Sequence, residues 1–391
     1  MTAPLRVFVI AGEASGDRLG APLLRALAAR RPLELAGVGG EQMAAAGLKP
    51  LFPAEDLAVM GLAEVLPRLP VILNRLRRTV AAARAFRPDL LLTIDSPAFS
   101  LRVARRVKHA LPRVRTVHYV APSVWAWRPG RAAEMARYVD HVLALLPFEP
   151  PYMTAAGMTC DFVGHPASVL VPPPEAARAA FRAEIGARGP LLCLLPGSRS
   201  GEIRRLSIPF RDAVSILRER HPELSVVLPA APGRAAQLRA AGWGEGIHLL
   251  DPDPLGPAEA EARKFLAMAA SDAALAASGT VTLELAAMGV PQVIGYRVAP
   301  VTAAVARRLI RVETANLVNL ITDSREVPEF LQENLIPARV ADAVDALLTD
   351  PSARIRQRAA AERTLTALGR GGPPPSELAA DSVLRALNIA A

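Results

Sequence analysis

The residues most suited to chemistry lie near the middle of the 391-residue chain, in the segment Leu191–Leu206, which reads LLCLLPGSRSGEIRRL. An apolar run of strand type ends in a short polar loop, and helical spacing begins at Glu202. Backbone N–H groups at such a helix start, together with the positive end of the helix dipole, favour a bound phosphate. The loop therefore predicts an anion site with three candidate contacts, Gly197, Ser198 and Arg199.

A second loop of this type follows the apolar run near the N-terminus. The segment Gly12–Asp17, GEASGD, repeats the spacing of Gly197–Glu202, GSRSGE. Glu13 and Ser15 are candidates for contact with a substrate, and a plain helix cap by Ser15 or Asp17 is the alternative. The repeat predicts two strand–loop–helix domains that face one cleft.

Asp95 is the candidate general base. It follows the apolar run in LLLTIDSPAFS, which is typical of a central strand. A carboxylate at the carboxyl end of such a strand can accept a proton from a substrate hydroxyl within hydrogen-bonding distance. The alternative is an aspartate that caps the following turn, helped by Pro97.

The segment His118–Trp127, HYVAPSVWAW, contains two of the three tryptophans. With His118, these aromatic side chains are suited to lining a sugar or acyl site. Packing in the core is the alternative, and it is the more frequent fate of such residues.

A third anion-favouring loop is predicted in AASGTVTLELAAM, where Ser278, Gly279 and Thr280 offer N–H and hydroxyl donors. Glu284 lies one helical turn further on the same face and can accept hydrogen bonds from a ribose diol. Its alternative role is to complement the helix dipole. This loop and the one at Gly197 together suit a diphosphate, and neither has the Gly-Lys-Ser/Thr of a P-loop.

Short apolar runs alternate with helical stretches along the chain, which predicts an α/β fold with parallel sheets and ligands at the carboxyl ends of the strands. A proline-rich stretch at residues 163–174 indicates a linker. We expect domains at 1–167 and 168–350, and a helical tail at 351–391 that packs back on a domain or on a partner chain. The predicted strands are Arg6–Ile10, Leu33–Val38, Asp89–Ile94, Thr116–Val120, His141–Leu145, Leu191–Leu195, Leu224–Pro229, Ile247–Leu250, Ala273–Ala277 and Gln292–Tyr296.

Composition restricts the compartment and the partners. Two cysteines, each in an apolar segment, allow no disulfide framework or zinc-ligand spacing, which favours a reducing cytosol. The net charge of +9 favours an anionic partner. Only 4% of residues are aromatic and no basic-aromatic interleaving occurs, so nucleic acid is not the expected partner. Arginine-rich codon usage is the alternative source of the charge.

Two segments have the composition of a peripheral membrane contact. Ala58–Arg78 and Val301–Val312 both combine apolar residues with bunched arginines, which suits the interface of an anionic bilayer. Ordinary amphipathic packing is the alternative for both segments. Pro67 and Pro70 argue against one straight helix in the first segment.

Seven motifs occur in order along the chain: AGEASGD at 11–17, GVGG at 37–40, HYVAPSVWAWR at 118–128, LPFE at 146–149, VGHP at 163–166, LLPGSR at 194–199 and ASGTVTLE at 277–284. IGYR at 294–297 and PEFLQE at 328–333 follow them. Together these motifs extend over nearly the whole chain, and they resemble the lipid-A-disaccharide synthase family.

This resemblance implies a glycosyltransferase of the GT-B type, with two Rossmann-like domains facing a cleft. The family joins UDP-2,3-diacylglucosamine to 2,3-diacylglucosamine 1-phosphate, with inversion and without a metal or other cofactor, at the cytoplasmic face of the inner membrane. Asp95 matches the family's essential aspartate, and Arg199, Glu284 and Asn319 match residues of its UDP-sugar site. The family's C-terminal region can exchange between subunits, which implies a homodimer through the tail.

The chain departs from the family pattern at Ala98, where a second acidic residue is usual, and at Val318. Two rival functions remain at this stage: a UDP-N-acetylglucosamine epimerase-like isomerase, and a nucleotide-sugar-binding protein that has lost catalysis.

Overall fold

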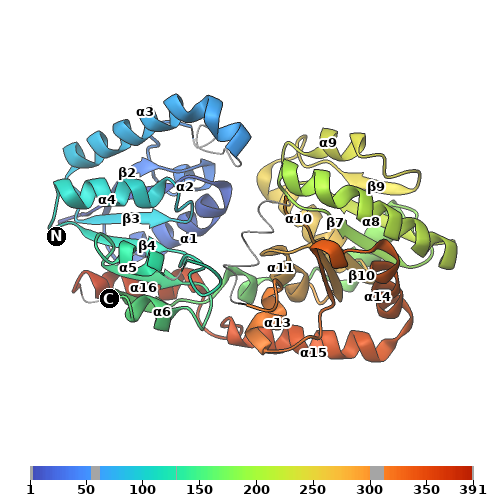
Figure 1. Ribbon diagram of the computed structural model, residues 1–391. Coiled ribbons are helices and arrows are strands. Elements are labelled where there is room, and N and C mark those ends of the chain that lie inside the picture. Colours follow the sequence, from blue (N-terminus) through green and yellow to red (C-terminus); the bar gives the residue numbers. More distant parts are fainter. Residues whose placement is uncertain (1–2, 54–61, 129, 300–311, 390–391) are drawn as a thin grey trace. The chain divides into compact units, whose positions relative to one another are not determined.

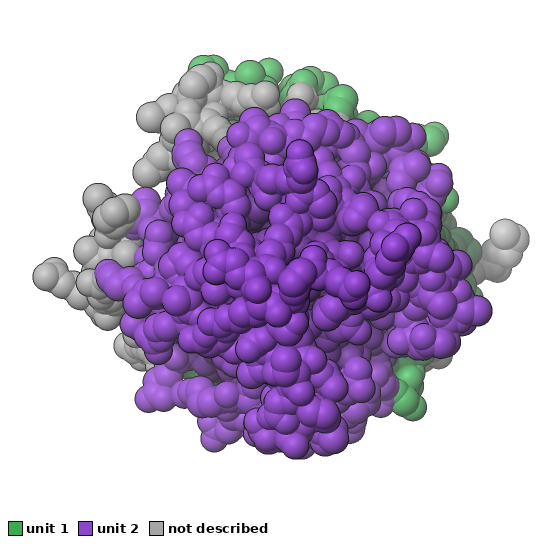
Figure 2. Space-filling view, turned by 90° about the vertical axis from the view of Figure 1, so that its right-hand side faces the viewer, with its two compact units in different colours: residues 1–166, 371–391 green, residues 167–370 purple. Residues whose placement is uncertain are grey.

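The computed structural model describes residues 3–53, 62–128, 130–299 and 312–389. For residues 62–68 it describes the backbone alone. The chain forms two compact units (Figure 2). Unit 1 comprises residues 1–166 and 371–391, and unit 2 comprises residues 167–370. Each unit is built around a parallel sheet with helices on its faces (Figure 1).

The sheet of unit 1 has six parallel strands in the order β2-β1-β3-β4-β5-β6. After β2 the chain crosses to the other side of β1, so the strand order reverses between β1 and β3. Ligands of such sheets bind where the order reverses, at the carboxyl ends of the strands. The strands are β1 (Leu5–Ala11), β2 (Leu33–Val38), β3 (Leu90–Ile94), β4 (Arg115–Tyr119), β5 (His141–Ala144) and β6 (Thr159–Phe162).

Alternating residues of β1 pack against different helices of unit 1, as the pleat of a strand requires. Val7 and Val9 belong to one buried cluster with residues of α1 and α16, whereas Phe8 and Ile10 belong to another with residues of α3 and α4. The described helices of this unit are α1 (Ala14–Arg30), α2 (Glu41–Ala45), α3 (Leu62–Phe86), α4 (Ser100–Ala110), α5 (Gly130–Met135), α6 (Pro150–Thr154) and α16 (Pro375–Ala386).

The sheet of unit 2 repeats this arrangement, with six parallel strands in the order β12-β11-β10-β7-β8-β9. Its order reverses between β7 and β10, whose register pairs Leu194 with Leu275. The strands are β7 (Leu191–Leu195), β8 (Ser225–Pro229), β9 (Ile247–Leu250), β10 (Ala273–Ala277), β11 (Gln292–Tyr296) and β12 (Glu329–Leu331).

The core of unit 2 lies between its sheet and the helices α8 and α14, with Phe210 among the fully buried side chains. The described helices of the unit are η2 (Pro166–Val169), α7 (Glu175–Glu184), α8 (Ser200–Arg220), α9 (Ala235–Ala240), α10 (Pro257–Ala269), α11 (Val281–Ala287), α13 (Leu317–Thr322), η3 (Gln332–Asn334), α14 (Pro337–Thr349) and α15 (Pro351–Ala367).

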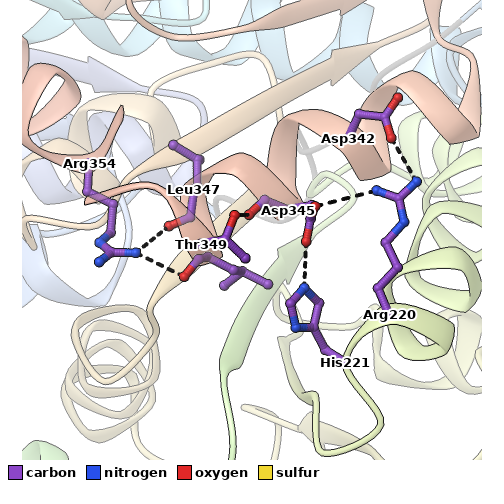
Figure 3. Close-up of polar contacts among 8 residues, drawn as sticks. Arg220, His221, Asp342, Asp345, Leu347, Thr349 and Arg354 are labelled. Atoms are coloured by element: carbon purple, nitrogen blue, oxygen red, sulfur yellow. Dashed lines mark hydrogen bonds and ion pairs between the residues drawn. The ribbon is translucent and has the colours of Figure 1, made fainter. Parts of the chain in front are cut away.

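A polar cluster joins the end of α8 to α14 (Figure 3). His221 Nε2 lies 2.6 Å from Asp345 Oδ1, and the Arg220 guanidinium lies 2.8 Å from Asp342 Oδ1. Arg354, on α15, donates to the carbonyl oxygens at the end of α14. These polar contacts join the helices of unit 2 in addition to their apolar packing.

The C-terminal segment 351–391 is divided between the units. Helix α15 belongs to unit 2, whereas α16 belongs to unit 1, where it packs against α1 (Figure 1). The Ser382 hydroxyl bridges two unit 1 side chains, at 2.7 Å from His141 Nε2 and 2.7 Å from Asp161 Oδ2. The chain therefore returns to complete the unit in which it began.

All ten predicted strands match observed strands within one residue at each end, and five of them match at both ends: Leu33–Val38, Leu191–Leu195, Ile247–Leu250, Ala273–Ala277 and Gln292–Tyr296. Two observed strands were not predicted, β6 and β12, which are sheet-edge strands of four and three residues. Helix α3 is continuous through Pro67 and Pro70. Residues 58–61 and almost all of Val301–Val312, both proposed for membrane contact, lie outside the described residues. No described helix is long and apolar enough to cross a membrane.

Candidate active site

Asp95 lies at the point where the strand order of unit 1 reverses, directly after β3. The Ser15 hydroxyl, from the loop after the neighbouring strand β1, donates a 2.7 Å hydrogen bond to Asp95 Oδ2. Both Asp95 and Ser96 have positive φ angles, 49° and 44°, a strained conformation that is found at functional sites. The fold thus brings together the predicted base, Asp95, and one of the predicted acceptor-side residues, Ser15.

The contacts of Asp95 favour its role as a base over a turn cap. The following turn is closed by Ser100, whose hydroxyl donates to the backbone oxygens of Asp95 and Ser96 at 2.6 and 2.9 Å. Within the part of the chain that the structure describes, the turn donates no hydrogen bond to the Asp95 carboxylate. Asp95 as a whole is half-buried and is not enclosed in the core.

Asp17 lies in α1, but its side chain caps the start of the next helix, α2. Its carboxylate accepts from the backbone N–H groups of Gly40, Gln42 and Met43 at 2.9 to 3.0 Å, at the start of α2. A side chain at position 40 would lie 2.6 Å from Asp17 Oδ2, which explains the glycine there. The GEASGD and GVGG motifs are therefore in direct contact through Asp17 and Gly40. Glu13, half-buried, stands at the N-cap position of α1 without capping it through its side chain.

His118 is fully buried in β4 beneath the site. Its Nδ1 lies 2.8 Å from the Thr93 hydroxyl on the adjacent strand β3. Burial lowers the pKa of His118 to about 4, against the opposing influence of the Asp95 carboxylate. The ring is therefore neutral near pH 7 and, in this conformation, supports the strands under Asp95 without reaching the surface.

Glu149 is a residue that the sequence analysis did not single out. It is 3% exposed and accepts hydrogen bonds from Trp125 Nε1 at 3.2 Å and from the Leu146 N–H at 3.0 Å. Burial raises its pKa to about 7. The Trp125–Glu149 contact joins the LPFE and HYVAPSVWAW motifs. Trp127, the last residue of the second motif, is 39% exposed, and the Arg128 guanidinium lies 4.6 Å from its ring centre.

The PGSR loop of unit 2 binds a carboxylate of the same chain, that of Glu202. Glu202 Oε2 accepts from the backbone N–H groups of Ser198 and Arg199 at 3.2 and 3.3 Å, and the Arg199 guanidinium lies 3.3 Å from Oε1. Gly197 has a φ of 113°, and a side chain there would lie 2.6 Å from Glu202. The predicted anion-binding groups thus exist, and a carboxylate of the same chain holds them.

The second predicted loop of unit 2 follows β10, the strand next to β7 at the reversal of strand order. The Ser278 hydroxyl donates to the Ala315 carbonyl oxygen at 2.5 Å, and Gly279 has a φ of 156° with open space where a side chain would be. Thr280 is the N-cap residue of α11. Both loops predicted for the diphosphate therefore lie at the carboxyl edge of adjacent strands, where such a sheet binds ligands.

Glu284 and Asn319 make contacts that the sequence did not reveal. Glu284 forms a 2.9 Å ion pair with Lys264 of α10. Asn319 is fully buried and joins the segment before β12: its amide donates to Val327 O and Glu329, and its oxygen accepts from the Val327 N–H. In this conformation Asn319 shapes the loop that contains Thr314–Asn316 beside Ser278.

Comparison with known proteins identifies the family. A family model described as lipid-A-disaccharide synthetase matches residues 7–376. A lipid-A-disaccharide synthase of Ruegeria pomeroyi is 51% identical over 387 residues, which cover 97% of this chain and 95% of the relative. The chain belongs to the lipid-A-disaccharide synthase family. Its α/β fold, with two parallel six-stranded sheets, is the fold that the resemblance implied.

Solved structures show that the GT-B fold carries several activities. A UDP-N-acetylglucosamine 2-epimerase of Neisseria meningitidis matches with a TM-score of 0.62 and 12% identity, over 98% of this chain and 99% of that one. The calicheamicin glycosyltransferase CalG4 matches with a TM-score of 0.56 and 19% identity, over 99% of each chain. At these identities the likeness establishes the fold alone.

Proposed function

We propose that this enzyme transfers a diacylglucosamine unit from UDP-2,3-diacylglucosamine to 2,3-diacylglucosamine 1-phosphate, forming a β-1,6-linked disaccharide and releasing UDP. Membership of the lipid-A-disaccharide synthase family supports this reaction. The observation that carries the mechanism is the Ser15–Asp95 hydrogen bond at the reversal of strand order in unit 1.

Asp95 acts as the general base for the acceptor hydroxyl. Ser15 holds one carboxylate oxygen, so the other can accept the proton as the hydroxyl attacks the sugar. A single displacement of this kind inverts the sugar configuration. Because water competes with the acceptor, both substrates must be held together with water excluded.

The donor binds in unit 2. Arg199, the N–H groups of the Gly197–Arg199 loop and the Ser278–Thr280 loop hold the diphosphate and stabilise the charge that develops on UDP as it leaves. The phosphates replace the Glu202 carboxylate on these donors. Glu284 binds the ribose diol while Lys264 fixes its carboxylate, and Asn319 positions the neighbouring loop.

Acylated substrates place the enzyme at an anionic membrane surface, the cytoplasmic face of the inner membrane. The described part of α3 supports a peripheral contact there, because Leu69, Val71 and Leu73 are each at least 39% exposed. Membrane pelleting tests this: retention at low salt with release by detergent is expected, and full solubility at low salt would contradict it. A homodimer through the tail requires α16 to make its contacts with α1 across two subunits.

The decisive experiment is Asp95→Asn with both acylated substrates. We expect unchanged UDP binding and a loss of turnover of about 10²-fold or more. Near-normal turnover would remove Asp95 from the mechanism. The unsubstituted protein in the same assay separates the two rival functions. UDP-sugar binding without product would indicate a binding protein. Conversion of unacylated UDP-N-acetylglucosamine would indicate an isomerase.

A further inference from the structure

A basic hollow, outside the candidate active site, lies along the outer face of α4. Its volume is about 1090 Å³, which is large enough for a ligand. The opposite face of α4, with Leu101, Val103, Ala104 and Val107, is buried in unit 1. The hollow is lined by Arg102, Arg105, Arg106, Lys108, His109, Pro112, Glu134, Arg137 and Tyr138. We refer to this set as the α4 hollow.

Two of its five Lys and Arg side chains have acidic partners. Lys108 Nζ lies 2.7 Å from Asp140 Oδ2, and Arg105 lies 3.9 Å from Glu134. Among the described residues, no carboxylate lies within ion-pair distance of the other three, Arg102, Arg106 and Arg137. The α4 hollow therefore presents three guanidinium groups without a counter-charge.

Helix stability does not account for this arrangement. Cations at the end of a helix complement its dipole, which explains Lys108 and His109. Arg102, however, lies in the first turn of α4, where a positive charge is unfavourable. Arg102 and Arg106 are also four residues apart, so their charges repel on one face. The Arg106 guanidinium turns back toward the first turn, where it donates to the Arg102 carbonyl oxygen at 3.1 Å.

We propose that the α4 hollow binds a phosphate-bearing anion. Guanidinium groups pair with two phosphate oxygens at once, and a bound phosphate removes the repulsion among Arg102, Arg106 and Arg137. A nucleic-acid strand fits less well, because Tyr138, the aromatic residue of the lining, is 8% exposed and offers no stacking surface. The phosphate comes from a soluble polyphosphate or from the headgroups of an anionic lipid surface.

The test compares the double variant Arg106→Gln/Arg137→Gln with a control of equal charge, Arg188→Gln/Arg358→Gln, whose exposed arginines lie in unit 2. Binding is measured by titration with tripolyphosphate, and by sedimentation with phosphatidylcholine vesicles that contain or lack phosphatidylglycerol. The α4 hollow variant should lose about tenfold or more in affinity for one of these anions, with the control unchanged.

Loss confined to tripolyphosphate identifies a soluble ligand, and loss confined to anionic vesicles identifies a lipid headgroup. Arg106→Lys/Arg137→Lys keeps the charge without the guanidinium fork and should recover only part of the affinity. Equal losses in both double variants, no loss in either, or loss of binding to a single-stranded oligonucleotide alone would overturn the proposal. Disaccharide synthesis in detergent, expected to be unchanged in all variants, shows that they are folded.

Discussion

At the scale of single residues, the anion-binding groups predicted from the sequence are present but occupied. The Ser198 and Arg199 N–H groups donate to Glu202, which lies four and three residues further along the chain and is largely buried. A helix start that binds phosphate also binds a nearby carboxylate, because both are anions with oxygen acceptors. At the proposed donor site, UDP must therefore compete with Glu202 for these donors.

This competition predicts that Glu202→Gln binds UDP more tightly. The amide oxygen can still accept a backbone hydrogen bond, whereas the competing negative charge is removed. We expect the dissociation constant for UDP, measured by calorimetric titration, to fall about fivefold. Glu223→Gln, an exposed position on the same unit, is the matched control. Weaker binding in the Glu202 variant alone would show that the ionised carboxylate is needed to shape the loop.

The buried Glu149 predicts a pH-dependent stability. Its pKa is raised from 4.5 to about 7 because burial penalises the carboxylate. Its contribution to stability is therefore fully present below pH 4.5 and is lost as the pH rises through 7. The shift corresponds to about 3 kcal/mol.

Glu149→Gln should remove that loss. The free energy of unfolding of both proteins is measured by urea titration at acidic pH and above pH 7. The difference, variant minus unsubstituted protein, should be larger above pH 7 by about 3 kcal/mol. Any hydrogen bond weakened by the amide shifts the difference equally at every pH, and the buried histidines titrate in both proteins. A difference that stays constant with pH would contradict the assignment.

At the scale of elements, contacts between helices contribute to unit 2 beyond its apolar core. Asp345 on α14 accepts from His221 after α8, in a contact where both side chains are at most 30% exposed (Figure 3). Asp342, one turn earlier, contacts the more exposed Arg220 and is itself 63% exposed. Exposed pairs contribute little, so the two aspartates should differ in their effect.

Asp345→Ala is therefore expected to lower the free energy of unfolding of unit 2 by about 1 kcal/mol relative to Asp342→Ala. Both changes place alanine on α14, so the gain in helix propensity is the same and cancels in the comparison. The difference in stability is measured by chemical denaturation, with UDP binding at each denaturant concentration as the probe of unit 2. Equal destabilisation by the two substitutions would show that the His221 contact adds nothing.

At the scale of the whole molecule, the chain crosses from unit 2 back to unit 1 near residue 370. The returning helix α16 buries Ala379, Ala380, Val383 and Leu384 completely or nearly so, in the cluster that includes Leu24 of α1. Unit 1 therefore lacks one wall of its core until the last residues of the chain are in place.

Truncation after Arg370 should destabilise unit 1 selectively. Its exposed core is expected to become sensitive to protease, whereas unit 2, with α15 intact, should bind UDP with unchanged affinity. Limited proteolysis with mass spectrometry and UDP titration measure the two effects. Ser382→Ala, which removes the hydroxyl between His141 and Asp161, should show a smaller effect in the same direction. Simultaneous loss of UDP binding would show that the units do not fold independently.

The sequence by itself determined the α/β class, most strands and the positions of the glycine-containing loops after β1, β7 and β10, because hydrophobic periodicity and glycine-containing loops are local signals. The edge strands β6 and β12 escaped detection, since a strand of three or four partly exposed residues has too little pattern. The family motifs predicted roles for Asp95 and Arg199, but not the contacts that hold their side chains.

Only the tertiary structure decided those contacts. Ser15 reaches Asp95 across 80 positions because β1 and β3 are neighbours in the sheet, and α16 joins unit 1 across more than 200 positions. Strand order sets which distant loops meet, and burial decides which polar side chains face solvent; neither is encoded in a local pattern. For this reason His118 and Asn319, which look available in the sequence, are buried supports in the fold.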